Sequence, residues 1–274
     1  MSTPLPGPLI AKGRTAEVYA WQEGQILKLF YDWCPSHWMQ QEINAGRVMA
    51  KKILPVPKLI ETLKIGKRQG IVYERVDGPS MLHLSNTKPW RLIGLARQLA
   101  ELHSQIHTPD GSGFPSLLSS LNAVIRQVEN LQPNLKTAVL GLLEKLPDGD
   151  ALCHFDFHPG QVLLTANGPV VIDWMTACQG NPLADVARTA LIFRVAQVPG
   201  AGWTTQVIVN LWRGLFQRTY LSRYIELHPG VTREMITTWM IPVAAGRMRE
   251  GIPGEQEALL RFIKSQIALY AAQE

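Results

Sequence analysis

The sequence predicts an α+β protein with a small β-rich N-terminal part and a larger, mainly helical C-terminal part. Most of residues 8–76 alternates short apolar runs with turn residues, as strands and hairpins do. After residue 89, apolar residues recur mainly at helical spacing. The turn sequence at 77–79, Asp-Gly-Pro, separates the two patterns. We therefore expect two domains, residues 1–76 and 77–274, with a cleft between them.

The N-terminal domain is expected to consist of hairpins and one helix. Residues 8–30 read as hairpin strands with a Gly-Arg-Thr turn at 13–15 and a Glu-Gly turn at 23–24. A cap at Ser36 and apolar residues at three- to five-residue spacing predict a helix over residues 36–53. Two more strands are expected over residues 59–63 and 70–76.

The C-terminal domain is expected to be helical around one short stretch of strands. Leucines on one face predict an amphipathic helix over residues 89–107, and further helices are expected at 116–130 and 134–146. Short strands surround the motif at 152–174. After residue 183 the chain is expected to be helical to its end, with interruptions near 198–202 and 228–230.

Composition excludes several classes of protein. No apolar run approaches the roughly 18–20 residues needed to span a bilayer, and the N-terminus lacks the pattern of a secretory signal. Three scattered cysteines without a CxxC pair fit a reducing cytoplasm. The net charge is +5, but the sequence has no run of basic residues and no basic-aromatic pattern of the kind that binds nucleic acid. We expect a cytoplasmic monomer or homodimer that binds neither nucleic acid nor membrane.

Two carboxylates and one amide carry the strongest chemical signal. Asp156 and Asp173 each lie at the edge of an apolar run, and Gln161 follows Asp156 by five residues. In protein kinases an aspartate accepts the proton of the attacking hydroxyl, an asparagine five residues later binds Mg²⁺, and a second metal-binding aspartate follows a strand. This chain has the same spacing with glutamine in place of asparagine. The spacing predicts a small-molecule kinase that uses a nucleotide and Mg²⁺.

Residues of the N-terminal domain could hold the nucleotide. The turn of Gly13, Arg14 and Thr15 could place backbone amides over phosphates, although most such turns are only turns, and no Walker A loop is present. Lys28 lies among apolar residues of a predicted strand, and Glu42 in the next helix is its natural partner. Together they would fix a cation against the phosphates.

The histidines and one further aspartate have alternative readings. His154 and His158 lie two residues to either side of Asp156 and could bind zinc, but no further ligand spacing supports this, so we expect them to steady the loop backbone. His103 and His107 are expected to be packing or surface residues. Asp185 is expected to cap a helix, and a role in anchoring the motif loop is compatible with that.

Together these motifs resemble the aminoglycoside phosphotransferase/choline kinase-like family, the small-molecule relatives of protein kinases. The resemblance implies a bilobal protein-kinase-like fold that binds ATP, with Asp156 as the catalytic base and Asp173 as a metal ligand. It further implies a hinge at residues 73–76, where backbone groups of Glu74 and Val76 would face the adenine. The matching segments lie at residues 13–19, 27–28, 154–160, 172–174 and 181–185.

The function expected from this resemblance is transfer of the ATP γ-phosphoryl group to a hydroxyl group of a small molecule. Gln161 departs from the family's asparagine, so the alternative is a nucleotide-binding protein with weak or no transferase activity. A protein kinase is disfavoured because no activation-loop segment follows Asp173. ATP and GTP are not distinguished. A neutral or anionic acceptor is expected rather than an aminoglycoside, because arginines are frequent after residue 186. They include Arg188, Arg194, Arg213, Arg218, Arg223, Arg247 and Arg249.

Overall fold

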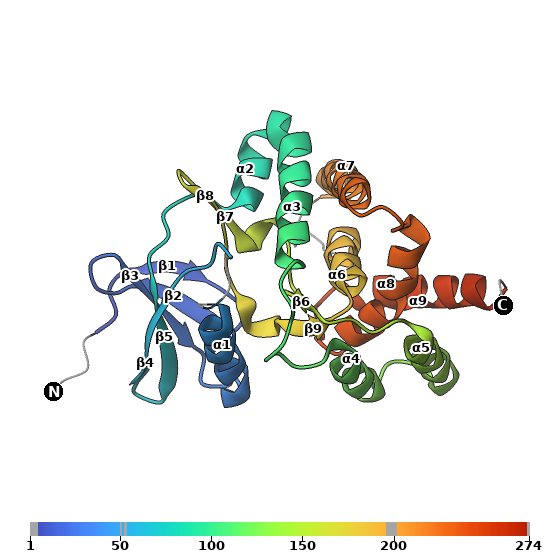
Figure 1. Ribbon diagram of the computed structural model, residues 1–274, viewed down its shortest axis with the longest axis horizontal. Helices are drawn as coiled ribbons and strands as arrows, with labels where there is room; N and C mark the ends of the chain where they lie inside the picture. The colour runs from blue at the N-terminus through green and yellow to red at the C-terminus, as the bar shows by residue number, and fades with distance from the viewer. Residues whose placement is uncertain (1–4, 50, 52–53, 196–201, 273–274) are drawn as a thin grey trace. The chain divides into compact units, whose positions relative to one another are not determined.

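The computed structural model describes residues 5–49, 51, 54–195 and 202–272 and divides into two compact units (Figure 1). The first unit combines Met1–Leu84 with Pro159–Ala177, and the second combines Ser85–His158 with Cys178–Glu274. The first unit is built on a β-sheet and the second is mainly helical, so the predicted α+β class is confirmed.

The first unit contains a five-stranded antiparallel sheet with the order β1-β2-β3-β5-β4. The predicted hairpins and the two later strands are confirmed, although β5 begins and ends two residues before the predicted range. The strands are β1 (Leu9–Lys12), β2 (Ala16–Ala20), β3 (Gln25–Phe30), β4 (Leu59–Ile65) and β5 (Arg68–Glu74).

Alternation along β3 gives the sheet two different faces. Leu27 and Leu29 belong to an apolar cluster on one face. Phe30 lies on the other face and packs with Ile43 of helix α1 (Ser36–Met49). Lys28, two residues before Phe30, lies on this α1 face, which is why its side chain meets a helix rather than solvent.

The segment Pro159–Ala177 joins the first unit through backbone hydrogen bonds. Its hairpin consists of β7 (Val162–Thr165) and β8 (Gly168–Val171). Leu164 donates to the Pro79 carbonyl at 2.9 Å, and Val171 donates to the Pro55 carbonyl at 2.8 Å. The compact units therefore differ from the single division expected after residue 76. Sequence periodicity does not show this return of the chain, because the partners are about 85–115 residues apart.

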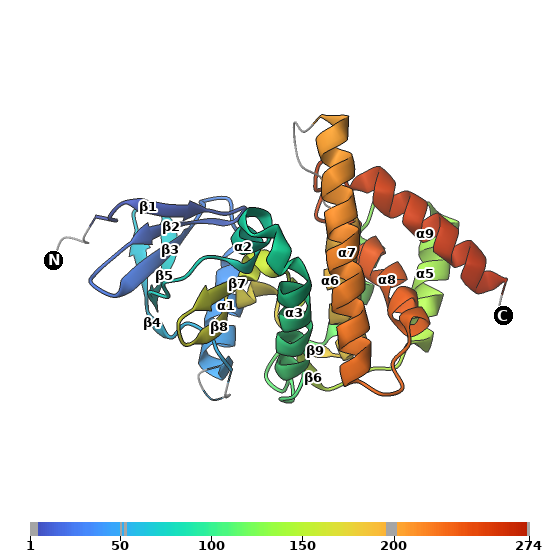
Figure 2. The ribbon, with the colours of Figure 1, turned by 90° about the horizontal axis from the view of Figure 1, so that it is seen from above.

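The second unit contains a bundle of helices and the two-stranded ladder of β6 (Ala151–Cys153) and β9 (Cys178–Gly180). Helix α6 (Pro182–Val195) is buried along most of its length and packs against α7 and α8, while α7 also packs against α3 (Figure 2). The remaining helices are α2 (Met81–Thr87), α3 (Leu92–Ile106), α4 (Leu117–Arg126), α5 (Pro133–Lys145), α7 (Trp203–Leu227), α8 (Arg233–Met248) and α9 (Gln256–Ala271).

The predicted helices of the second unit are confirmed, with one break that the sequence did not suggest. The interruption near 228–230 separates α7 from α8, and the one expected near 198–202 lies largely outside the described residues. A further break follows Met248 and precedes α9. Among the residues that the structure describes, no helix has the length and apolar character needed to cross a membrane.

We predict opposite effects for two glycine-to-alanine changes. A Cβ on Gly78 would overlap the Leu164 carbonyl group, so Gly78→Ala should lower the free energy of unfolding by about 1–3 kcal/mol. Gly94 lies within α3 with open space around it, so Gly94→Ala should raise that free energy by about 0.5–1 kcal/mol. Urea unfolding followed by circular dichroism measures both. An unchanged midpoint for Gly78→Ala would contradict the close packing of residue 78 on β7.

Candidate active site

A buried ammonium group with two carboxylate partners forms the centre of the first unit's polar site. Lys28 Nζ lies 2.8 and 2.7 Å from the two carboxylate oxygens of Glu42 and 2.9 Å from Asp173 Oδ1. The three side chains come from β3, from α1 and from the segment that follows β8. The predicted partnership of Lys28 and Glu42 is thus present, and Asp173 joins it.

Burial and charge act in opposite directions on this ammonium. The Lys28 side chain is 12% exposed and that of Glu42 is 3% exposed. Burial by itself lowers the pKa of Lys28, but the carboxylates of Asp173 and Glu42 outweigh it and hold that pKa above its ordinary value. Lys28 is therefore a fixed cation at neutral pH. Burial raises the pKa of Glu42, while the charge of Lys28 opposes that rise. With both carboxylates ionised, the group of three side chains carries one excess negative charge.

Asp173 is held in an unusual backbone conformation next to Gln161. Its φ of 64° lies in the left-handed region, which costs a residue other than glycine about 1–3 kcal/mol and is found mainly where function requires it. Gln161 Nε2 lies 3.4 Å from Asp173 Oδ2. The structure thus brings together Lys28, Glu42, Asp173 and Gln161, all of which were predicted as site residues.

Tyr73 is a member of this group that the sequence motifs did not single out for this contact. Its hydroxyl donates to Glu42 Oε1 at 3.0 Å, so Glu42 is fixed by both Lys28 and Tyr73. Alternation along β5 could have indicated this contact. Tyr73 is two residues from Ile71, which packs on the α1 face, so both side chains point to the same face of the sheet.

The other predicted nucleotide contacts lie on the same sheet. Gly13, Arg14 and Thr15 form the turn between β1 and β2, where the Gly13 amide donates to the Ala16 carbonyl at 2.9 Å. Glu74 ends β5, and its backbone amide donates to the Lys58 carbonyl at 2.9 Å, so this amide already has a partner. Val76 follows directly after β5.

In the second unit, Asp185 fixes the backbone immediately before Asp156. Its carboxylate accepts the backbone N–H groups of His154 at 2.6 Å and Phe155 at 3.0 Å. Phe155 has a φ of 59°, again in the left-handed region. The Asp156 amide in turn donates to His154 Nδ1 at 3.3 Å, so His154 steadies the loop as predicted. The expected capping role of Asp185 is wrong, because the Asn181 side chain accepts from the Leu183 amide at the start of α6.

Two histidine–tyrosine pairs converge on the same carboxylate. His103 Nε2 lies 3.1 Å and His107 Nε2 lies 3.4 Å from Asp185 Oδ2. The opposite ring nitrogens meet the hydroxyls of Tyr220 at 2.6 Å and Tyr224 at 2.8 Å. His103 and His107 are therefore polar partners of Asp185 as well as packing residues. His103 lies on α3, and His107 follows four residues later at the C-cap of that helix. The two tyrosines are also four apart on α7, so each pair lies on one face of its helix.

Asp156 has a charged neighbour that no sequence motif indicated. Arg188 lies on α6, 3.6 Å from Asp156 Oδ1 and 2.6 Å from Glu250 Oε1. The Arg188 side chain is 7% exposed, against 30% for Asp156 and 27% for Glu250. The sequence does place Arg188 three residues after Asp185, so both side chains lie on the same face of α6, and this spacing was the one indication that Arg188 is near the motif loop.

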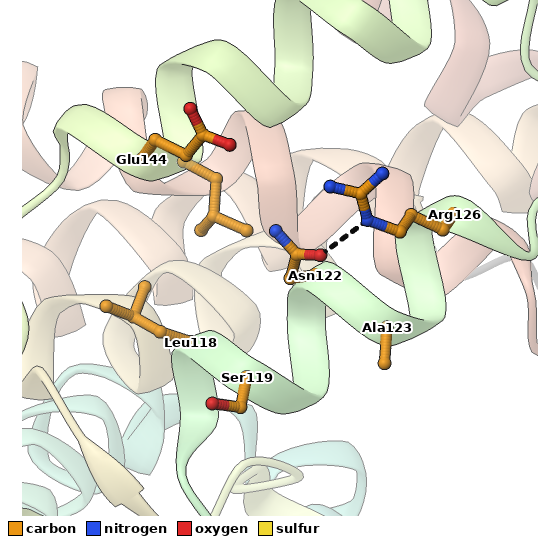
Figure 3. Close-up of a pocket in the computed structure, with 7 residues that line it drawn as sticks. Leu118, Ser119, Asn122, Ala123, Arg126 and Glu144 are labelled. Carbon is orange, nitrogen blue, oxygen red and sulfur yellow. Dashed lines mark hydrogen bonds between the residues drawn. The ribbon is translucent and has the colours of Figure 1, made fainter.

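A hollow elsewhere in the second unit contains none of these groups. It measures about 520 Å³ between α4 and α5, and its polar side chains include Asn122, Arg126 and Glu144 (Figure 3). Arg126 Nε donates to Asn122 Oδ1 at 2.7 Å. None of the predicted site residues lines this hollow, so it gives no support for phosphoryl transfer there.

A comparison with protein families shows the family to which the chain belongs. The family model described as the phosphotransferase enzyme family matches residues 9–223. The chain belongs to this phosphotransferase family. The predicted resemblance is therefore confirmed, and small-molecule phosphotransfer is its general chemistry.

Solved structures agree with the family in fold. An aminoglycoside-3'-phosphotransferase of type VIII aligns with a TM-score of 0.61 and 19% identity over 88% of this chain and 91% of that one. Amicoumacin kinase aligns with a TM-score of 0.60 and 15% identity over 97% and 89%. A choline/ethanolamine kinase family protein from Mesorhizobium loti gives 0.60 and 15% over 97% and 87%. No curated protein matches the chain.

We predict that acid destabilises this phosphotransferase through His103. Burial lowers the pKa of His103 from 6.5 to about 4, against the opposing charge of Asp185. Between these values the unfolded chain binds a proton that the folded protein does not, so stability falls as the pH falls from about 6.5 to 4. One such group contributes at most about 1.4 kcal/mol per pH unit.

Urea unfolding at several pH values measures this slope. His103→Gln removes the titrating group, so the variant should lose stability less steeply over the same range, whatever its stability at pH 7. Asp185 adds to this slope only near the acid end of the range, because its pKa is lowered well below 3.8 in the folded protein and an unfolded aspartate binds a proton only as the pH approaches that value. Equal slopes for the wild type and the variant would contradict the assignment to His103.

Proposed function

We propose that this phosphotransferase transfers the γ-phosphoryl group of ATP to a hydroxyl group of a small molecule. The observation that carries the proposal is the contact of Lys28 with both Glu42 and Asp173. Phosphoryl transfer needs a fixed cation for the phosphates next to a carboxylate that can bind a metal. A related kinase, amicoumacin kinase, was solved with AMP-PNP and Ca²⁺, which supports a nucleotide and a divalent cation as ligands.

The donor set of the first unit suits Mg²⁺. Asp173 offers carboxylate oxygens, and Gln161 offers an amide whose oxygen and nitrogen can exchange places by rotation. Hard cations such as Mg²⁺ prefer such oxygen ligands, and the excess negative charge around Lys28 favours a cation. Asp173 and Gln161 would hold the ion, and the bound ion would neutralise phosphate charge. Lys28 would bind phosphate oxygens, while Glu42 and Tyr73 keep its ammonium in place.

Asp156 has the role of the base in this proposal. Its carboxylate is partly exposed, and Asp185 holds the backbone just before it through two N–H groups. A carboxylate in that position can orient the acceptor hydroxyl and accept its proton. Arg188 contacts the same carboxylate and restrains its side chain. His158 is left without an assigned chemical role.

The charges near Asp156 change the expectation for the acceptor. The preference for a neutral or anionic acceptor rested on the number of arginines after residue 186. Arg188 is buried against Glu250, Arg223 pairs with Glu101 at 2.7 Å, and Arg247 pairs with Glu255 at 2.7 Å. These arginines are paired with carboxylates, and Glu250, which is 27% exposed, shares Arg188 with Asp156. We therefore propose a hydroxylated acceptor that is neutral or carries an amine.

The alternative is a nucleotide-binding protein with weak transferase activity. It draws on Gln161, whose side chain is one methylene longer than the family's asparagine and whose contact with Asp173 is long at 3.4 Å. Both functions require nucleotide binding in the first unit. Only the kinase requires turnover that depends on Asp156, so binding and turnover are tested separately below.

We predict that Mg-ATP raises the melting temperature of the wild-type protein. At about 100 times Kd, a ligand adds about 2.7 kcal/mol, which corresponds to several degrees for a protein of this size. Lys28→Ala should lose most of this shift because the phosphates lose their fixed cation. Lys64→Ala on an exposed position of β4 should retain it. Each variant is compared with its own melting temperature without ligand, and a wild type that shows no shift with Mg-ATP would refute nucleotide binding.

We predict that Asp156→Asn lowers turnover by about 10²–10⁴-fold while ATP affinity changes by only a few-fold, because the base acts on the acceptor hydroxyl. ATP consumption is first screened over amino alcohols, aminoglycosides, sugars and nucleosides to find an acceptor. Asp150→Asn, an exposed change in the same unit, is the control. Full turnover by Asp156→Asn would refute its role as base. Tight ATP binding without turnover on any acceptor would favour the alternative function.

A further inference from the structure

The N-terminal half of α7 has its apolar residues on the outside. From Trp203 to Leu215 no residue is buried, whereas the C-terminal half buries Phe216, Tyr220 and Tyr224. In Figure 2 this N-terminal half extends beyond α3, the helix against which α7 packs. Six large apolar side chains, here called the α7 stripe, are exposed: Trp203 (76%), Val207 (43%), Ile208 (54%), Leu211 (69%), Trp212 (41%) and Leu215 (45%).

Helical geometry places the α7 stripe opposite the buried side of the helix. At 3.6 residues per turn, the six residues occupy one half of the circumference. Of the four buried residues, Phe216, Tyr220 and Tyr224 lie on the other half, and Leu221 lies at the boundary between the two halves, in line with Trp203. Toward the helix N-terminus, that inner half continues with the half-buried Val209 and with the polar residues Gln206 and Arg213. An ordinary surface helix has the reverse arrangement, with its apolar side inward.

This arrangement favours a covering partner. A helical segment of this length is marginal in water unless tertiary packing stabilises it. A large aromatic side chain covers about 150–250 Å², so the exposed fractions correspond to roughly 600 Å² of apolar surface. That value is at the upper end of the largest apolar patch on a typical monomer, about 300–600 Å². Patches of this kind mark interaction sites.

We propose that a second copy of this chain covers the α7 stripe, with the two α7 helices antiparallel about a two-fold axis. With the axis between residues 209 and 210, Ile208 would face Leu211 of the partner and Val207 would face Trp212 of the partner. Each contact then occurs twice, as a self-complementary two-fold interface requires, and the smaller Val207 meets the larger Trp212.

Area and charge both favour this occupant. Two stripes would bury at most roughly 1,200 Å² in total, the lower limit of standard interfaces, so a dimer that dissociates on dilution is expected. Arg218 lies on the same half of the helix just after the stripe. Antiparallel pairing separates the two Arg218 side chains by roughly 25 Å along the helix, whereas parallel pairing would place them together. Helices that lie on membranes are rich in Lys and Arg on their polar face, but this segment has mainly Thr, Gln and Asn there.

Sedimentation analysis of the full chain tests the proposal. The wild type should sediment as a dimer at tens of micromolar and dissociate on dilution, and Leu211→Glu should be monomeric at the same concentrations. Leu269→Glu is the matched control, because Leu269 is a similarly exposed leucine (59%) on α9. It should remain dimeric. Circular dichroism and melting temperature check that both variants are folded, and a monomeric wild type, or a dimer that survives Leu211→Glu, overturns the proposal.

A cross-linking experiment tests the orientation of the helices. In a Cys34→Ser background, a short bis-maleimide should join two copies of Leu211→Cys, whose positions lie near the axis. It should not join two copies of Trp203→Cys, which would be roughly 20 Å apart. Cross-linking of both variants would indicate parallel helices and overturn the proposed pairing.

Lipid binding is the competing explanation of the α7 stripe. Vesicles of phosphatidylcholine and phosphatidylglycerol should leave the wild type in the supernatant after centrifugation. Co-sedimentation with these vesicles that Leu211→Glu abolishes and Leu269→Glu retains would overturn the proposal of a second copy.

Discussion

A single ammonium group shared by two carboxylates is the interaction on which the first unit's site depends. Lys28 can reach Glu42 only because α1 packs on the face of the sheet to which Lys28 points. It can reach Asp173 only because the β7–β8 hairpin returns to this unit through the backbone of residues 55 and 79. Removing one partner of a buried ion pair costs about 3–5 kcal/mol, so the three side chains constrain the sheet, the helix and the hairpin together.

The second unit uses a buried carboxylate for a different purpose. Asp185 is fully buried in the second unit. It accepts two backbone N–H groups and lies near two histidine rings. Burial raises the pKa of a carboxyl group, but the neighbouring His103 and, after it, His107 outweigh burial and hold the pKa of Asp185 well below its ordinary value. An ionised Asp185 can therefore hold Phe155 in a left-handed conformation, which fixes the start of the segment that carries Asp156.

The two units thus share one physical device. In each, a residue with positive φ lies at or next to an aspartate proposed to act in catalysis, and charged or polar neighbours hold it there. Asp173 is restrained by Lys28, and Phe155 is restrained by Asp185. Strained residues of this kind persist only where the surroundings determine them strongly. The two strained residues lie at or next to Asp156 and Asp173, the aspartates whose spacing in the sequence indicated phosphoryl transfer.

The sequence by itself determined the fold class, most helices and strands, the family, and the residues Lys28, Glu42, Asp156, Asp173 and Gln161 as candidates. These follow from local periodicity and from motif spacing, which are properties of nearby residues. Only the tertiary structure decided that Asp185 holds a loop instead of capping a helix, because the outcome depends on backbone groups about 30 residues away. It also decided that Arg188 is paired with Glu250, 62 residues further along the chain, and that the apolar face of α7 points outward. A charge count or an apolar pattern shows which side chains are present, but their partners are set by packing between distant segments.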